Sequence, residues 1–77
     1  MQTTLEIQER LESLISQTVK LVQLNYPYHP FIYGRISQGK HADTFTIINQ
    51  ENAIDIRGIN AKRVLEIQGE TIYYIGG

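Results

Sequence analysis

The sequence has no cysteine, only two prolines, no long apolar run and no large excess of charge of one sign. Without cysteine, neither a disulfide framework nor a thiolate metal site can stabilise the chain. No apolar run approaches the ~20 residues that a membrane-spanning helix needs, so we expect no membrane insertion. The net charge of −1 does not by itself indicate a nucleic-acid-binding surface.

The opening residues lack the basic and apolar regions of a secretory signal peptide. A cytoplasmic location is therefore predicted, in a bacterium or a phage-infected cell. The length of 77 residues predicts a single domain spanning residues 1–77, near the lower size limit for folding without cross-links. A core this small gains from a partner subunit, so we expect a homo-oligomer.

The N-terminal segment has the pattern of an amphipathic helix. Thr3 followed by Glu6 forms a capping-box pattern, which marks a helix start. After it, apolar residues recur at helical spacing, at Ile7, Leu11, Leu14 and Ile15. We therefore predict a helix over residues 4–17.

From residue 18 onward the apolar period changes to the period of two that is typical of strands. Strands are predicted over 18–24, 31–38, 44–49, 53–57, 63–67 and 71–75, with a short 3₁₀ turn at 59–61. Gly34 lies inside the second strand, where glycine favours a bend that curls a small sheet. The predicted fold is mainly β with one N-terminal helix, in which residues 18–75 form a small, five- to six-stranded, antiparallel and strongly bent barrel.

A leading helix followed by short strands, with a glycine-bent second strand, resembles the Sm-like barrel and the YolD-like small proteins of bacteria. The resemblance covers roughly residues 4–67 and depends on Gly34-Arg35 and the pattern Ile59-Asn60-Ala61-Lys62-Arg63-Val64-Leu65-Glu66-Ile67. An SH3-like barrel has almost the same pattern. The acidic-asparagine motif that Sm-like proteins use around uridine is not evident after the second strand. The resemblance therefore implies the fold far more than RNA binding.

Aromatic and basic residues cluster around the second predicted strand, and this combination suits stacking on bases or gripping a nucleotide. Alternation places Phe31, Tyr33 and Arg35 on one face, and Ile32 and Ile36 on the other. The aliphatic face is the better core candidate. The alternative is that Phe31 and one or two of the tyrosines form the core. The candidate ligand-binding residues are Tyr28, Tyr33, Arg35, Lys40, His41 and Arg57.

Three of these residues have plain structural alternatives. Lys40 and His41 lie in a polar, glycine-bearing segment that suits a solvated loop as well as a phosphate contact. Arg57 is predicted on the polar side of its strand with Asp55, opposite Ile54 and Ile56. There it can form a surface ion pair with Asp55 or Glu66, which contributes little to stability.

Catalysis and metal binding have little support in the sequence. Ser37, His41 and Asp43 contain the atoms of a catalytic triad, but neighbours in one loop do not hold its geometry. The chain has two histidines and no cysteine, so no structural zinc site is evident. We predict a protein that is not an enzyme and takes no cofactor or metal.

The leading functional prediction is a small binding module that forms a homo-oligomer and binds a protein partner as a regulator or inhibitor. The alternative is binding of RNA, single-stranded DNA or a nucleotide through the aromatic and basic surface. The last predicted strand, 71–75, is apolar on both faces, with Tyr73 and Tyr74 pointing opposite ways. Ile72 and Ile75 are therefore predicted to support self-association.

Overall fold

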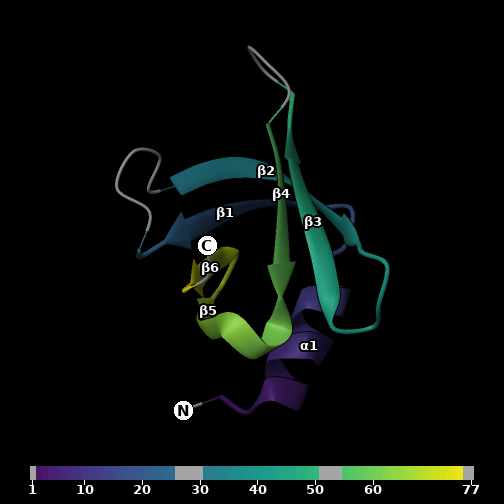
Figure 1. Ribbon diagram of the computed structural model, residues 1–77, viewed down its shortest axis with the longest axis vertical. Helices are drawn as coiled ribbons and strands as arrows, with labels where there is room; N and C mark the ends of the chain where they lie inside the picture. Colours follow the sequence, from purple (N-terminus) through teal and green to yellow (C-terminus); the bar gives the residue numbers. More distant parts are fainter. Residues whose placement is uncertain (1, 26–30, 51–54, 76–77) are drawn as a thin grey trace.

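The computed structural model describes residues 2–25, 31–50 and 55–75, and Figure 1 shows one helix beside a curled sheet. The elements are α1 (Thr4–Ser13), β1 (Thr18–Gln23), β2 (Phe31–Gln38), β3 (Thr44–Asn49), β4 (Asp55–Asn60), the 3₁₀ helix η1 (Ala61–Arg63), β5 (Val64–Gln68) and β6 (Thr71–Tyr74). This arrangement confirms the prediction of a mainly β fold with one N-terminal helix. Within the described part of the chain, no helix is long and apolar enough to cross a membrane.

Helix α1 begins as predicted and ends four residues early. The Thr3 hydroxyl oxygen accepts a hydrogen bond from the Glu6 backbone N–H at 3.1 Å, which is the expected N-cap. The prediction that the helix continues to Gln17 is wrong. The chain instead turns at Ser16, whose φ is 74° and whose N–H donates to the Ile36 carbonyl oxygen at 2.9 Å. This contact with β2 takes the place of the hydrogen bond that a continued helix would give the Ser16 N–H.

The six strands form one mixed sheet in the order β4-β3-β2-β1-β6-β5. Neighbouring strands are antiparallel except for β1 and β6, which are parallel. The expectation of a wholly antiparallel sheet is therefore wrong at this pair. The reason is topological: η1 and the β5–β6 hairpin bring β6 back to the free edge of β1 in the same direction as β1.

The sheet curls so strongly that strands distant in its order touch. The Arg57 guanidinium on β4 donates to the Gln23 side-chain oxygen on β1, although β3 and β2 lie between these strands in the sheet. Likewise the Asn60 N–H at the end of β4 donates to the Tyr74 hydroxyl on β6 at 3.3 Å. Among the described residues β4 and β5 do not pair, so the sheet is curled and not closed.

The core lies inside this curl, with α1 closing one end beside η1 and β5 (Figure 1). Its buried side chains are mainly aliphatic and come from α1 and its C-cap, from all six strands and from η1. They are Ile7, Leu11, Leu14, Val19, Leu21, Ile32, Ile36, Phe45, Ile47, Ile59, Ala61, Val64, Ile67, Ile72 and Tyr74. Phe45 and Ile47 point inward, as the period-two alternation of the strand predicted over residues 44–49 leads us to expect.

Strand β4 is rotated relative to the prediction. It continues through Gly58 to Asn60, and it pairs Arg57 with Ile47, whose side chain is buried. Arg57 therefore faces inward, while the Ile56 side chain is 60% exposed on the outer side. The predicted orientation, with Ile56 inward, is wrong because successive strand residues alternate faces and register is fixed by the partner strand. Ile54 lies outside the described residues.

The last strand is also buried more deeply than the sequence suggested. Ile72 and Tyr74 belong to the core, and Tyr73 lies on the opposite side, half-buried. The opposite orientations of the two tyrosines are thus confirmed. Ile72 is fully buried within its own chain, so it is not available to support self-association, whereas Ile75 is exposed.

Candidate functional site

The outer side of β1 and β2 carries the aromatic and basic residues that the sequence singled out. Ile32, Gly34 and Ile36 face the core, so Phe31, Tyr33 and Arg35 face outward, as predicted. The strand pairing sets Lys20 opposite Tyr33 and Val22 opposite Phe31, and the neighbouring β6 adds Tyr73 beside Val22. We call this surface the aromatic face. It consists of Lys20, Val22, Phe31, Tyr33, Arg35 and Tyr73.

Two rings on this face are held in a fixed arrangement without being buried. The Phe31 and Tyr33 ring centroids are 6.0 Å apart with planes at 84°, an edge-to-face pair. Lys20 Nζ lies 4.8 Å from the Phe31 centroid and 5.7 Å from the Tyr33 centroid. A cation at such distances is attracted to the ring faces. Phe31 is nevertheless 50% exposed and Tyr33 52% exposed, so both rings can contact a ligand.

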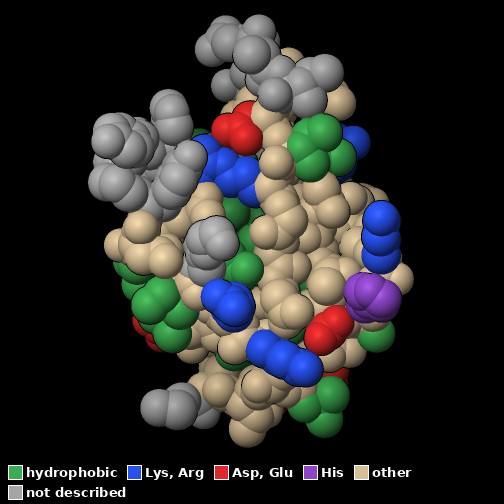
Figure 2. All heavy atoms as spheres, viewed as in Figure 1, with side chains coloured by type: hydrophobic (Ala, Val, Ile, Leu, Met, Phe, Trp, Pro, Cys, Tyr) green, Lys and Arg blue, Asp and Glu red, His purple; other side chains and the backbone are tan. Residues whose placement is uncertain are grey.

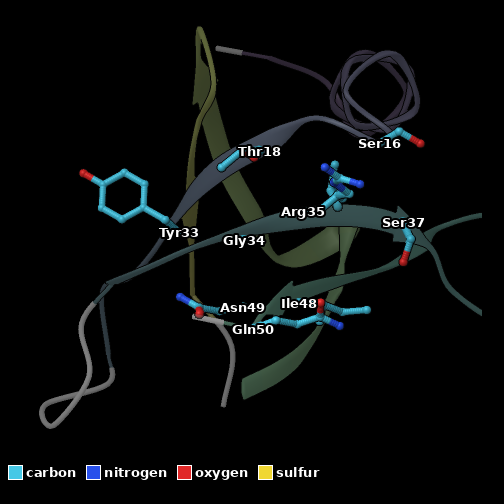
Figure 3. Close-up of a pocket in the computed structure, with 10 residues that line it drawn as sticks. Ser16, Thr18, Tyr33, Gly34, Arg35, Ser37, Ile48, Asn49 and Gln50 are labelled. Carbon is cyan, nitrogen blue, oxygen red and sulfur yellow. The ribbon is translucent and has the colours of Figure 1, made fainter. Parts of the chain in front are cut away.

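Beside the rings, the side chain of Arg35 stands in an open hollow of ≈ 450 Å³. Figure 3 shows Arg35 between Thr18 and Ser16 on one side and Asn49 and Gln50 on the other. The hollow is lined by Ser16, Thr18, Tyr33, Gly34, Arg35, Ile36, Ser37, Ile48, Asn49 and Gln50. The Arg35 side chain is exposed and forms no ion pair or hydrogen bond with any residue that the structure describes. It can therefore accept an outside anion without losing an internal partner.

Gly34 allows β2 to approach β3 closely beneath this hollow. A Cβ at Gly34 would lie 2.7 Å from Ile47 Cγ2 and 2.8 Å from the Ile48 carbonyl oxygen. Both distances are shorter than real carbon contacts, so only glycine fits without a shift of β3. Gly34 is therefore required by the close packing of β2 on β3, whereas the bend that the sequence predicts at Gly34 stays a prediction.

Lys40 and His41 lie in a different place, in the exposed loop between β2 and β3. The loop is tied by hydrogen bonds from the Gly39 N–H to the Thr44 carbonyl oxygen at 2.9 Å and from the His41 N–H to Thr44 Oγ1 at 2.9 Å. Both residues line a second hollow, with neighbours from β3, β4 and β6, and neither lines the hollow at Arg35. The structure therefore does not bring them into one site with Tyr33 and Arg35.

Arg57 is inside the curl of the sheet, where its guanidinium has internal partners. Arg57 Nη2 lies 3.1 Å from Asp55 Oδ2, so the predicted pairing with Asp55 is confirmed. The same guanidinium also donates to Gln23. Its side chain is 11% exposed, against 45% for Asp55, so the pair is not the fully solvated one that the sequence predicted. The arrangement suits Arg57 to holding β4 against β1.

The remaining candidates form no reactive centre with these residues. Ser37 lines the hollow at Arg35, whereas His41 lines the other hollow, so the atoms of the considered triad are divided between two places. Over residues 2–25, 31–50 and 55–75, no group of three or more metal-ligating side chains is placed to hold a metal ion. Tyr28 lies outside the described residues.

Sequence reasoning missed several contributors to the site, and Lys20 and Ser16 show why. Lys20 was not among the candidate residues, although its alternation with Val19 and Leu21 already placed it on the side away from the core. Ser16 was assigned to the helix, and its position at the rim of the hollow has no local sequence signal. It depends on the contact between Ser16 and Ile36, which lie on different elements.

Comparisons of the chain with family models, with curated proteins and with solved structures gave no match. The Sm-like and YolD-like resemblance therefore stays a prediction about the fold.

Proposed function

We propose that this protein is a small, non-enzymatic binding module that docks a protein partner on its aromatic face. The observation that carries the proposal is the half-exposed Phe31–Tyr33 pair, held edge-to-face under the Lys20 ammonium group. Rigid aromatic side chains are common anchors in protein interfaces, because they offer a large contact area and lose little conformational entropy on binding. Rings fixed before binding keep this entropy cost low.

The charge distribution favours a protein over a nucleic acid as the partner. The net charge is −1, and Figure 2 shows Lys and Arg side chains spread over the visible face, with acidic and hydrophobic groups between them. A surface that binds a phosphate backbone gathers its cations into one patch or stripe. On the aromatic face the cations are Lys20 and Arg35, and neither has an ion pair with a described residue. They complement a partner segment of modest negative charge.

Self-association belongs to the same proposal. The sheet presents β4 and β5 as its outer strands in the described part, and outer strands offer unpaired backbone groups to another chain. The exposed Ile56 on β4 and Ile75 after β6 add apolar area to such a contact. A second copy of a 77-residue chain with a small core would bury this surface.

We also propose that the curled sheet is an open barrel of the Sm-like or SH3-like kind. The hydrogen bonds from Arg57 to Gln23 and from Asn60 to Tyr74 support this proposal, because they join strands across the curl as closure of a barrel requires. The close approach of β2 to β3 at Gly34 supports it as well.

Site-specific photo-crosslinking tests the protein-partner proposal. A benzophenone amino acid replaces Tyr33 in one version of the full chain and the exposed Leu65, which lies outside the aromatic face, in the control version. We expect a saturable protein adduct from position 33 only, weakened about tenfold or more when Phe31→Ala is added, as for an interface anchor. Equal adducts from both positions, or none from position 33, would contradict the proposal.

Binding of single-stranded nucleic acid or a nucleotide is the second candidate function. It is favoured by the exposure of Tyr33 and Arg35 on the same face, since base stacking on an aromatic ring is worth ~1–3 kcal/mol. Under this alternative, affinity for an oligonucleotide falls steeply with salt, and Arg35→Ala flattens the salt dependence by removing one phosphate contact. Under the leading proposal, neither the wild type nor the variant binds an oligonucleotide with such dependence.

A further inference from the structure

Arg35 differs from Arg57, Lys62 and Arg10 in that its side chain lines a hollow and has no described acceptor of the chain beside it. Arg57 is paired with Asp55, Lys62 Nζ lies 3.9 Å from an Asp43 carboxylate oxygen, and the Arg10 guanidinium donates to the Gly69 carbonyl oxygen at 3.1 Å. Arg35 has no such contact with any described residue, and the hollow around it is open to solvent. Its five N–H donors are therefore available to an acceptor from outside.

Apart from Arg35, the described residues that line the hollow carry no charge. Besides Arg35, the residues with side-chain hydrogen-bonding groups are Ser16, Thr18, Tyr33, Ser37, Asn49 and Gln50. None of the ten lining residues described is acidic. An incoming anion thus meets one guanidinium together with hydroxyl and amide groups, and no carboxylate among the described lining residues repels it.

This donor set fits a carboxylate better than a phosphate. The planar guanidinium fork matches two carboxylate oxygens and neutralises their single negative charge. A phosphate monoester carries about −1.5 to −2 charges near neutral pH. Arg35 is the only cation among the ten lining residues described.

The rim of the hollow is held in a strained but defined conformation. Ser16 has φ 74°, a left-handed conformation that is unfavourable for a residue with a side chain. It is kept there by hydrogen bonds between the Ser16 N–H and the Ile36 carbonyl oxygen at 2.9 Å, and between the Ile36 N–H and the Gln17 carbonyl oxygen at 3.1 Å. Strain held by surrounding structure is frequent at binding sites. Here it places Ser16 among the residues that line the hollow at Arg35.

We propose that the hollow at Arg35 recognises a carboxylate of the protein docked on the aromatic face. This inference rests on the proposed function and adds its specificity. Tyr33 lines the hollow and also belongs to the ring pair, so an acidic residue of the partner in the hollow sets an adjacent apolar residue against Tyr33 and Phe31. The carboxylate comes from an Asp or Glu side chain or from the C-terminus of the partner.

The test is an NMR titration of the intact, ¹⁵N-labelled protein that follows the Arg35 side-chain N–H signal and the backbone amides of β2. The probes are the short peptides acetyl-Phe-Glu-amide and acetyl-Phe-Gln-amide, which differ in one carboxylate. Acetyl-Gly-Phe with a free C-terminus and its amide form the second pair, and adenosine monophosphate is the phosphate probe. The variants are Arg35→Gln and, as a matched control, Arg63→Gln, since Arg63 is exposed and lies outside the hollow.

We expect at least one carboxylate peptide to bind about tenfold or more tightly than its uncharged partner, as a charge-assisted hydrogen-bonded pair predicts. This difference should disappear in Arg35→Gln and persist in Arg63→Gln. A preference for the glutamate peptide identifies a side chain as the source, and a preference for the free C-terminus identifies a chain end.

Three results would overturn the proposal. Equal binding within both peptide pairs, through the phenylalanine alone, would refute the carboxylate site and leave the docking face in place. Preferential binding of adenosine monophosphate at Arg35 would assign the hollow to a phosphate and favour the second candidate function. No binding by any probe would also refute the carboxylate site, and the crosslinking experiment at position 33 would then decide separately whether the face docks a protein.

Discussion

Arg35 and Arg57 lie on strands of the same sheet and have opposite surroundings. Arg35 is on the outer side of β2, exposed and without a partner among the described residues. Arg57 is on the inner side of β4, 11% exposed, bonded to Asp55 and Gln23. A guanidinium whose donors are satisfied inside the fold acts on stability, whereas one with open donors on the surface is available for binding. The side of the sheet, more than the residue type, decides which role an arginine takes.

The register of the strands decides the side. Arg35 is paired with Ile48, and Arg57 is paired with Ile47, so the two arginines align with consecutive residues of β3. Consecutive residues of a strand point to opposite faces. A shift of β4 by one residue would bring Ile56 inward and release Arg57 to solvent, which is the arrangement that the sequence pattern suggested.

The largest expected difference in stability is between substitutions at an inner and at an outer position near the C-terminus. Ile72→Asp places a carboxylate at a fully buried core position and should destabilise the fold by about 4 kcal/mol or more. Ile75→Asp changes an exposed residue and should leave the unfolding midpoint nearly unchanged while weakening self-association. Thermal unfolding and light scattering measure the two effects. A folded Ile72→Asp protein would contradict the inner placement of β6, and a monomeric wild type at high concentration would remove the proposed assembly.

A second comparison uses two glycines on opposite sides of the sheet. Gly34→Ala should destabilise by about 1–3 kcal/mol, because its Cβ would meet Ile47 and the backbone of Ile48. Gly58→Ala is the control, since a Cβ there has no heavy atom within 4 Å, and its effect should stay within about 0.5 kcal/mol. Urea unfolding measures both. If the two substitutions have equal effects, the close approach of β2 to β3 is not what restricts residue 34.

The two arginines can be compared by the same change. Arg57→Gln removes the charge beside Asp55 and shortens the reach to Gln23, so we expect a loss of about 1–3 kcal/mol of unfolding free energy. Arg35→Gln alters an exposed side chain without internal partners and should stay within about 0.5 kcal/mol of the wild type. Chemical denaturation provides the values, and a larger loss for Arg35→Gln would reverse the assigned roles.

The smallest expected effect lies where α1 passes into β1. Ser16→Gly should stabilise the protein by up to about 1 kcal/mol, because glycine adopts the positive φ without steric cost. Ser13→Gly, inside the last turn of α1, should instead destabilise by about 0.5 kcal/mol. If unfolding experiments show that Ser16→Gly stabilises the protein and Ser13→Gly destabilises it, the early end of the helix is supported. Destabilisation by both changes would agree with the longer helix that the sequence predicted.

Much of the fold could be predicted from local pattern. The helix cap at Thr3, the bounds of β2 and β3, and the inward positions of Phe45 and Ile47 follow from capping chemistry and from period-two alternation. The outward placement of Tyr33 and Arg35 also follows, because Ile32 and Ile36 make the better core face. These signals involve residues that are close together in sequence.

What could not be predicted depends on contacts between distant segments. The early end of α1 results from pairing of Ser16 with Ile36, and the inward turn of Arg57 results from the register with Ile47. The parallel pairing of β1 with β6 depends on how the whole chain returns after η1. The hollow at Arg35 combines residues from β2, β3 and the turn after α1, so no single stretch of sequence contains it.

The most direct measurement is the hydrogen exchange of the two arginine Nε–H protons, followed by NMR in the unmodified protein. The Arg57 Nε–H donates toward Asp55 at 3.4 Å inside the curl, so its exchange should be strongly slowed relative to a free arginine. The Arg35 proton should exchange at nearly the free rate. Equal exchange of the two protons, or protection of Arg35 alone, would contradict the division between an inner structural arginine and an outer arginine available for binding.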